Sequence, residues 1–154
     1  LIMQYLHTMI KSANLDLTLD FFINKLGLNE LRRYENKEGK FTLVFLCAPN
    51  DLNNSLINQA PLIEITYNWP DEINNKNKKL EVGRAFGHIA FRVDDIYKIC
   101  DKLIKKGVIL NRPPRDGYMA FVKSPDNISI ELLKKDDPLK PKEPWKNMPN
   151  YGVW

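Results

Sequence analysis

The segment Gly87-His88-Ile89-Ala90-Phe91 has a counterpart near the beginning of the chain, Leu6-His7-Thr8-Met9-Ile10. Both segments have the residues of a β-strand, with a histidine near the start, and each is followed by an Asx residue and an amphipathic helical pattern. No other histidine occurs in the 154 residues. Similarity at matching places in two halves of a chain indicates an internal structural repeat.

The rest of each half follows the same plan. Apolar residues at helical spacing predict helices over Leu15–Leu26 and Ile96–Lys106, each preceded by an Asx cap and ended by a glycine. Each half then reads as strand, helix and three strands, an α+β pattern. The first half is longer mainly by an Asn-rich polar loop, Ala48–Ala60. The strands expected after the helices are Leu31–Tyr34, Phe41–Cys47 and Pro61–Tyr67 in the first half, and Val108–Arg112, Tyr118–Lys123 and Ile128–Leu133 in the second.

The composition changes at Asp136. Prolines at 138, 141, 144 and 149 exclude a regular helix or a central strand, so residues 136–154 are expected to form an extended arm. Trp145 and Trp154 could fix this arm to a groove, and an arm with a loose end is the alternative. Residues 1–135 are then expected to be a single domain made of two repeats, at about 4–69 and 84–135.

Several function classes are disfavoured by composition and charge. No apolar run approaches the roughly 18 residues that a membrane span needs. Leu1–Ile10 has no basic leader and no small-residue cleavage site, so no signal peptide is expected there. The net charge is +4, and the basic clusters Lys76–Lys79 and Lys102–Lys106 lack interleaved aromatic residues. Neither a nucleic-acid partner nor a membrane is therefore expected.

The chain has two cysteines, Cys47 and Cys100, which lie in apolar strand and helix patterns without a C-x-x-C spacing. Isolated cysteines of this kind are typical of buried thiols in a reducing compartment. A cytoplasmic location is expected.

Four polar side chains occupy matching places in the two halves. Glu64 and Glu131 each lie between two large aliphatic residues in the last strand of their half, and His7 and His88 lie in the first. A single such glutamate is usually solvent-facing, and a lone strand histidine is usually a hydrogen-bonded structural residue. Independent placement of that kind does not account for the repetition of both residues.

A shared divalent metal ion does account for it. Imidazole and carboxylate ligands suit Zn²⁺, Ni²⁺ or Co²⁺. Burial of the two carboxylates without a partner would be costly, and a divalent ion removes that cost. Four protein ligands leave coordination positions open for water or substrate, and the absence of thiolates disfavours a closed structural zinc site.

Around these residues the sequence resembles the glyoxalase I (lactoylglutathione lyase) family of the vicinal oxygen chelate superfamily. The resemblance extends from about Leu6 to Leu133. The Glu-x-Thr-Tyr-Asn-Trp segment at 64–69 is specific to glyoxalase I, whereas the His and Glu positions are shared across the superfamily. The segments that carry it are Leu6-His7-Thr8-Met9, Leu62-Ile63-Glu64-Ile65-Thr66-Tyr67-Asn68-Trp69, Phe86-Gly87-His88-Ile89-Ala90, and Ala120-Phe121-Val122-Lys123-Ser124-Pro125-Asp126 followed by Ile130-Glu131-Leu132.

The resemblance implies paired βαβββ modules whose curled, mixed sheets enclose a metal site. It also implies a homodimer with its sites at the subunit interface. One subunit would supply His7 and Glu64, and the other His88 and Glu131. Each site would hold one divalent ion, Ni²⁺ or Zn²⁺, with Co²⁺ as a further candidate.

The activity that the resemblance implies is detoxification of methylglyoxal. Its hemithioacetal with glutathione would be isomerised to S-lactoylglutathione. The reaction moves a proton between neighbouring carbons through an enediolate, which requires a carboxylate that takes the proton and returns it. The family assigns this role to the glutamate at the position of Glu131, and Glu64 is the second candidate for a catalytic residue.

The resemblance also implies residues that bind the substrate, and one of them departs from the family's pattern. Asn68 and Arg84 stand where the family binds the glutathione tripeptide. Lys11 stands where the family usually has arginine; lysine keeps the charge but loses the bidentate fork, which leaves the thiol open. Arg115 and Met119, in a loop shorter than that of many members, are candidates for lining the substrate.

Other readings stay open at this point. A thiol transferase acting on fosfomycin and an epimerase of acyl-CoA thioesters belong to the same superfamily. An extradiol dioxygenase would use Fe²⁺ with two histidines and one carboxylate, so the second carboxylate disfavours it. A non-enzymatic small-molecule-binding module would be expected to have lost ligands, and all four are present. The sequence does not choose between Ni²⁺ and Zn²⁺.

Overall fold

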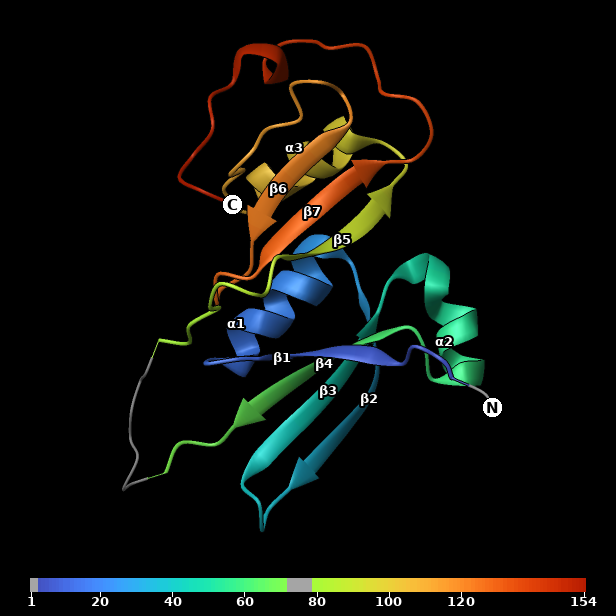
Figure 1. The fold of residues 1–154 in the computed structure, drawn as a ribbon, viewed down its shortest axis with the longest axis vertical. Helices are drawn as coiled ribbons and strands as arrows, with labels where there is room; N and C mark the ends of the chain where they lie inside the picture. The colour runs from blue at the N-terminus through green and yellow to red at the C-terminus, as the bar shows by residue number, and fades with distance from the viewer. Residues whose placement is uncertain (1–2, 72–78) are drawn as a thin grey trace. The chain divides into compact units, whose positions relative to one another are not determined.

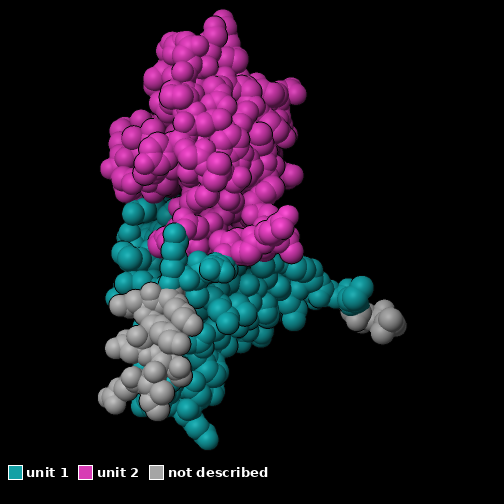
Figure 2. Space-filling model, turned by 60° about the vertical axis from the view of Figure 1, so that its left-hand side comes forward, with its two compact units in different colours: residues 1–81 teal, residues 82–154 magenta. Residues whose placement is uncertain are grey.

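A computed structural model describes residues 3–71 and 79–154. The chain divides into two compact units, Leu1–Glu81 and Val82–Trp154 (Figure 2). Each unit contains one of the two expected repeats. Within the expected basic cluster Lys76–Lys79, the first three residues lie outside the described part.

The first unit is built on a four-stranded mixed sheet in the order β1-β4-β3-β2. β1 and β4 are parallel, and the other two pairs are antiparallel. The elements are β1 (His7–Lys11), α1 (Leu15–Leu19), the π-helix η1 (Asp20–Leu26), β2 (Asn29–Asn36), β3 (Phe41–Cys47), the 3₁₀ turn η2 (Pro49–Asp51), α2 (Leu52–Asn58) and β4 (Leu62–Asn68) (Figure 1).

The first helix has the extent and caps that the sequence predicts. Asn14 accepts a hydrogen bond from the Leu17 amide at 3.1 Å, and Gly27 ends the helix at φ 98°, where a side chain would be strained. The second part is a π-helix, which the α-helical spacing does not predict. It buries both Phe21 and Phe22, and the two rings meet edge to face.

The prediction of a polar loop over Ala48–Ala60 is wrong, because the segment contains η2 and α2. The helix lacks an apolar stripe, since its buried contacts are partly polar. Ser55 is fully buried and donates to the Pro61 carbonyl at 3.0 Å, and Asn54 donates to the Ala60 carbonyl at 3.0 Å. Periodicity in hydrophobic residues therefore could not reveal this helix.

The second unit has a three-stranded mixed sheet in the order β5-β7-β6. β5 is parallel to β7, and β6 is antiparallel to it. The helix α3 (Ile96–Lys105) packs on β6 and β7. Asp95 caps its N-terminus and accepts hydrogen bonds from two backbone amides. The elements are β5 (His88–Val93), α3 (Ile96–Lys105), β6 (Met119–Lys123), β7 (Ser129–Lys134) and the 3₁₀ turn η3 (Trp145–Asn147). Two modules with mixed sheets confirm the α+β class.

The predicted strand Val108–Arg112 is wrong. Only an isolated bridge, Arg112 to Phe121, remains of it. Asn111 and Arg112 donate their amides to the Phe121 carbonyl, and the next two residues, Pro113 and Pro114, have no N–H with which to continue a ladder. Arg112 nevertheless lies opposite Phe121, as a residue of a regular outer strand would.

The expected arm is fastened to the second unit. The Tyr97 hydroxyl donates to the Lys140 carbonyl at 3.0 Å, and the Trp145 ring stacks on the Tyr97 ring with centroids 6.1 Å apart. The arm crosses the α3 side of the unit and returns toward β6 (Figure 1). Trp145 is buried and lies in η3, so the arm is extended apart from one helical turn.

Two further expectations concern the described part of the chain. The Cys47 and Cys100 thiols are buried and free. None of the described helices is long and apolar enough to cross a bilayer.

Candidate metal centre

The first unit brings His7 and Glu64 into contact. His7 on β1 is paired in register with Leu62 on the adjacent strand β4, so Glu64, two residues further, lies on the same face. The imidazole Nε2 is 2.7 Å from the carboxylate Oε2. The Glu64 side chain is only 14% exposed, so this carboxylate is largely removed from water.

The second unit repeats this arrangement with His88 and Glu131. His88 on β5 is paired with Ser129 on β7, and Glu131 again follows by two residues. The Nε2–Oε2 distance is 2.9 Å, and the Glu131 side chain is 13% exposed. The equivalence that the sequence predicts between the two halves therefore extends to the geometry of the pairs.

Each pair also has an aromatic neighbour that the sequence reasoning missed. Phe45 lies opposite Glu64 in the β3–β4 ladder, and Phe121 lies opposite Glu131 in the β6–β7 ladder. The His7 and Phe45 ring centroids are 6.0 Å apart at 75°, and those of His88 and Phe121 are 5.4 Å apart at 85°. Both phenylalanines are 6% exposed. The signal in the sequence was a phenylalanine inside the middle strand of each half, although the first of these strands also contains Phe41.

The donor atoms suit a divalent ion. Each pair places one imidazole nitrogen and one carboxylate oxygen about 3 Å apart, as expected of two ligands bound to one ion at about 2.0–2.2 Å. Within either unit, the described residues form no group of three or more His, Cys, Asp or Glu side chains that could hold a metal. Each unit therefore supplies half of the expected four-ligand set.

Three of the expected substrate-binding residues are exposed and lie near these pairs in sequence or register. Lys11 ends β1 and shares the face of His7 because an even number of residues separates them. Asn68 ends β4 on the face of Glu64 by the same rule. Arg84 lies in the bend before β5.

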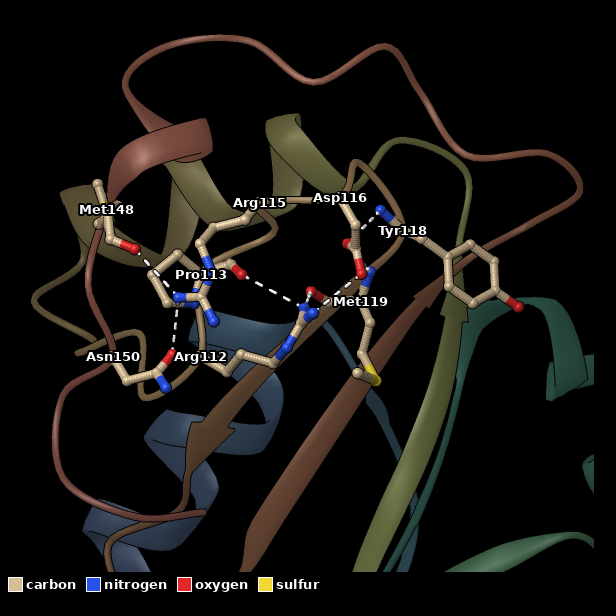
Figure 3. Close-up of polar contacts among 8 residues, drawn as sticks. All are labelled: Arg112, Pro113, Arg115, Asp116, Tyr118, Met119, Met148 and Asn150. Atoms are coloured by element: carbon tan, nitrogen blue, oxygen red, sulfur yellow. Dashed lines mark hydrogen bonds and ion pairs between the residues drawn. The ribbon is translucent and has the colours of Figure 1, made fainter.

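The other two expected residues lie in and beside the loop that precedes β6. The Arg115 guanidinium donates through Nη1 to the Met148 carbonyl at 3.0 Å and to the Asn150 side-chain oxygen at 2.7 Å (Figure 3). Arg115 thus fastens the arm. Met119 begins β6 two residues before Phe121, and the two side chains share a face.

This loop is stabilised by Asp116. Its carboxylate pairs with Arg112 Nη2 at 2.9 Å and accepts from the amides of Tyr118 and Met119 at 2.9 and 3.0 Å (Figure 3). Burial by itself would raise the pKa of Asp116, but the hydrogen bonds from Arg112 and from the two amides lower it below its usual value. Arg112 also donates to the Met119 carbonyl.

The arm brings a second aromatic residue to Phe121. Tyr151 and Asn111 are joined by two hydrogen bonds, from the Tyr151 amide at 2.9 Å and from the Asn111 side chain at 3.0 Å. Beyond this point the Trp154 ring lies with its centroid 6.1 Å from that of Phe121. No pattern in the sequence predicts the register that brings Trp154 to Phe121.

Residues 4–132 match the family described as the Glyoxalase/Bleomycin resistance protein/Dioxygenase superfamily. The chain is 36% identical over 138 residues to the lactoylglutathione lyase of Neisseria meningitidis serogroup B, covering 86% of this chain and 91% of the relative. It is 40% identical over 134 residues to the probable lactoylglutathione lyase of Vibrio cholerae, covering 84% and 88%.

Among solved structures, the trypanothione-dependent glyoxalase I of Leishmania major is similar, with a TM-score of 0.72 and 33% sequence identity. The match covers 86% of this chain and 87% of that structure. The similarity therefore extends over nearly the whole of each protein.

Proposed function

Because the chain belongs to the Glyoxalase/Bleomycin resistance protein/Dioxygenase superfamily, we propose that it is a lactoylglutathione lyase that converts the hemithioacetal of glutathione and methylglyoxal to S-lactoylglutathione. The observation that carries the proposal is the His–Glu pair repeated in each module. The similarity to enzymes of that name covers most of the chain. Methylglyoxal detoxification is the corresponding physiological role.

His7, Glu64, His88 and Glu131 would hold one divalent ion, Ni²⁺ or Zn²⁺, with Co²⁺ as a further candidate. When bound, such an ion supplies electrostatic stabilisation of the negative charge that develops on the substrate oxygens. The donor set supports this assignment because it contains two imidazole nitrogens and two carboxylates and no thiolate. The buried Phe45 and Phe121 rings exclude water from one side of each imidazole and keep its orientation.

Glu131 is the proposed base. Its carboxylate takes the proton from the carbon that bears sulfur and returns it to the neighbouring carbonyl carbon, while the hydroxyl proton of the hemithioacetal moves to the former carbonyl oxygen. The first carbon is thereby oxidised and the second reduced, so no external oxidant or reductant is needed. Glu64 is the second carboxylate and serves the opposite side of the substrate. Lys11, Asn68 and Arg84 are proposed to bind the glutathione part, and Met119 and Arg115 to border the substrate.

We also propose the assembly and the location that the family resemblance implies. One domain, residues 1–135, is made of the two modules and carries the arm 136–154. Two such chains form a homodimer, in which His7 and Glu64 of one subunit face His88 and Glu131 of the other. The buried thiols of Cys47 and Cys100 support a reducing compartment, the cytoplasm.

The activity is tested with purified protein that is stripped of metal by a chelator and reloaded with Ni²⁺, Co²⁺ or Zn²⁺. Glutathione and methylglyoxal are added, and thioester formation is followed by its ultraviolet absorbance. We expect metal-dependent turnover, and we expect none from a His88→Ala variant treated in the same way. No thioester with any of the three ions would contradict the proposed function.

The shared site is tested by mixing two inactive variants, His7→Ala and Glu131→Gln. If each site takes its ligands from two subunits, a heterodimer has one site with both defects and one intact site. Statistical pairing should then restore about one quarter of the wild-type activity. If each site lies within one chain, every site keeps one defect and the mixture stays inactive.

A further inference from the structure

Strand β2 contains an irregularity that separates two adjacent arginines. The pairing with β3 shifts between Glu30, opposite Leu46, and Arg32, opposite Phe45, so that Leu31 is an extra residue in the ladder. A bulge of this kind interrupts the alternation of faces along a strand and redirects the side chains that follow. Leu31 packs against the cluster that includes Phe45, and Arg32 also lies on Phe45, so two consecutive residues share one face.

The opposite face receives Arg33. Its guanidinium forms two hydrogen bonds to the Glu30 carboxylate, from Nε at 2.8 Å and from Nη2 at 3.0 Å. Residues three apart in a regular strand lie on opposite faces, so this contact exists because of the bulge. The hydrogen bonds to Glu30 raise the pKa of Arg33. Arg33 is therefore satisfied by a partner in its own strand.

Arg32, unlike Arg33, has no partner in its own strand and packs on an aromatic ring. Its guanidinium carbon lies 3.9 Å above the centroid of the Phe45 ring, which packs edge to face with the His7 ring. Among residues 3–71 and 79–154 it has no carboxylate partner. The register places Arg32, Phe45 and Glu64 in one row across neighbouring strands. An exposed cation is thus held over an apolar ring, two strands from the Glu64 carboxylate.

In the second module, the position equivalent to Arg32 makes different contacts. Arg112 lies opposite Phe121, which lies opposite Glu131, so Arg112 is the counterpart of Arg32. Arg112 is occupied by Asp116 and by the Met119 carbonyl (Figure 3). The two arginines share a position, and only Arg32 keeps its donors available.

We propose that Arg32 is a substrate-binding residue whose guanidinium binds a carboxylate of the thiol substrate on the His7–Glu64 face. The inference rests on the proposed function, because the substrate named there has two carboxylates on its glutathione part. A planar guanidinium binds carboxylate through two parallel hydrogen bonds, and the Phe45 ring limits its rotation before the substrate arrives. Lys11 adds positive charge to the same face but lacks that fork.

The experiment compares wild type with Arg32→Gln, Arg32→Lys and the matched control Arg33→Gln. Steady-state rates are measured with the methylglyoxal hemithioacetals of glutathione and of glutathione diethyl ester, in which both carboxylates are blocked. For Arg32→Gln we expect about a tenfold rise in KM with glutathione, kcat within about twofold of wild type, and no more than about a twofold difference with the diester. Arg32→Lys should lie between wild type and Arg32→Gln, and Arg33→Gln should match wild type with both substrates.

Binding of S-hexylglutathione, measured by calorimetry on the same four proteins, separates this inference from the proposed function. If wild type has no activity with any metal, the proposed function fails, and tenfold weaker binding by Arg32→Gln than by Arg33→Gln still supports the role of Arg32. If wild type is active and the two glutamine variants have equal KM and equal affinity, the role of Arg32 is overturned and the function stands. An equal loss with glutathione and with its diester also overturns it. Arg32→Lys keeps the test available if Arg32→Gln does not fold.

Discussion

Phe45 and Phe121 occupy the same place in their two sheets: each lies across the antiparallel ladder from the glutamate of its module and packs edge to face with the module's histidine ring. The contact restricts how the imidazole can turn. It also removes water from one side of the His–Glu pair. Both effects would orient the two donor atoms for the proposed ion before it binds.

The first prediction concerns this aromatic contact. Phe121→Leu keeps most of the buried volume and should cost less than about 1.5 kcal/mol of unfolding free energy. It removes the ring that orients His88, so nickel affinity should fall about tenfold, measured by competition with a chelator. Phe91→Leu, on the opposite face of the same sheet by the alternation along β5, is the control and should leave the affinity unchanged. Equal affinities in the two variants would show that the Phe121 ring has no orienting role.

The second prediction tests the proposed base. Glu131→Gln removes the carboxylate that accepts the proton and should lower kcat by about 10²–10⁴. The metal content, measured by mass spectrometry of the loaded protein, should stay well above that of the His88→Ala variant, since three ligands and an amide oxygen remain. Glu38→Gln, in the exposed turn between β2 and β3, is a charge-matched control. A near-normal rate in Glu131→Gln would assign proton transfer to another group.

Most of the strands and the two matching His–Glu pairs could be predicted from the sequence because their signals are local and repeated. The buried strand β3 begins and ends where its apolar run does. The equivalence of His7 with His88 needed only the comparison of two short segments. The element α2 could not be predicted in this way, since Ser55 and Asn54 satisfy backbone carbonyls instead of adding to an apolar stripe.

Features that depend on residues far away in the sequence could not be predicted. The extra residue at Leu31 depends on pairing with β3, and no local pattern marks it. Val108–Arg112 has strand-forming residues, but Pro113 and Pro114 end the pairing at one bridge. The place of Trp154 depends on all the contacts of the arm before it.

The third prediction concerns the attachment of the arm. Gly117 has φ +72°, and an added Cβ would lie 2.0 Å from the Leu139 carbonyl oxygen, which belongs to the arm. Gly107 has nearly the same φ, +77°, but no atom within 4 Å of the added Cβ. Gly107→Ala should therefore cost only the conformational strain, about 1–2 kcal/mol of unfolding free energy in a urea titration. Gly117→Ala should cost roughly 1–3 kcal/mol more because of the steric clash.

The same pair of variants reports on the arm directly. Limited proteolysis should cleave Gly117→Ala between residues 136 and 154 faster than wild type. The reason is that the hydrogen bond from the Leu139 amide to the Gly117 carbonyl cannot form unchanged. Gly107→Ala should be cleaved there at the wild-type rate. Equal protection of the arm in both variants would mean that the close approach at Gly117 does not hold it.

The fourth prediction concerns acid stability. The pKa of Asp116 is lower in the folded protein than its usual value, so this group stabilises the fold at pH values above the unfolded-state pKa. The stabilisation is lost as the pH falls through the folded-state pKa. The difference in unfolding free energy between wild type and Asp116→Asn should be constant near neutral pH and decrease toward zero at strongly acid pH.

Urea titrations at a series of pH values check this. Because the Asp116 side chain is 44% exposed, 1 M salt should reduce the difference measured near neutral pH. Arg112→Gln should show a smaller dependence on acid than wild type, and combining it with Asp116→Asn should give less than the sum of the two effects. Additive effects would show that the two side chains stabilise the loop independently.

Arg32 and Arg112 occupy equivalent positions in the two repeats but make different contacts. A duplicated ancestor would have carried the same residue at both places, and its descendants could change one copy while the other preserved what was needed. In this chain the histidines and glutamates are alike in the two halves, whereas Arg112 is held by Asp116 and the Met119 carbonyl and Arg32 has no carboxylate partner among the described residues. Equivalent positions in two copies of a module therefore need not keep the same duty, and a position freed from structural contacts in one copy is available to distinguish between reactants.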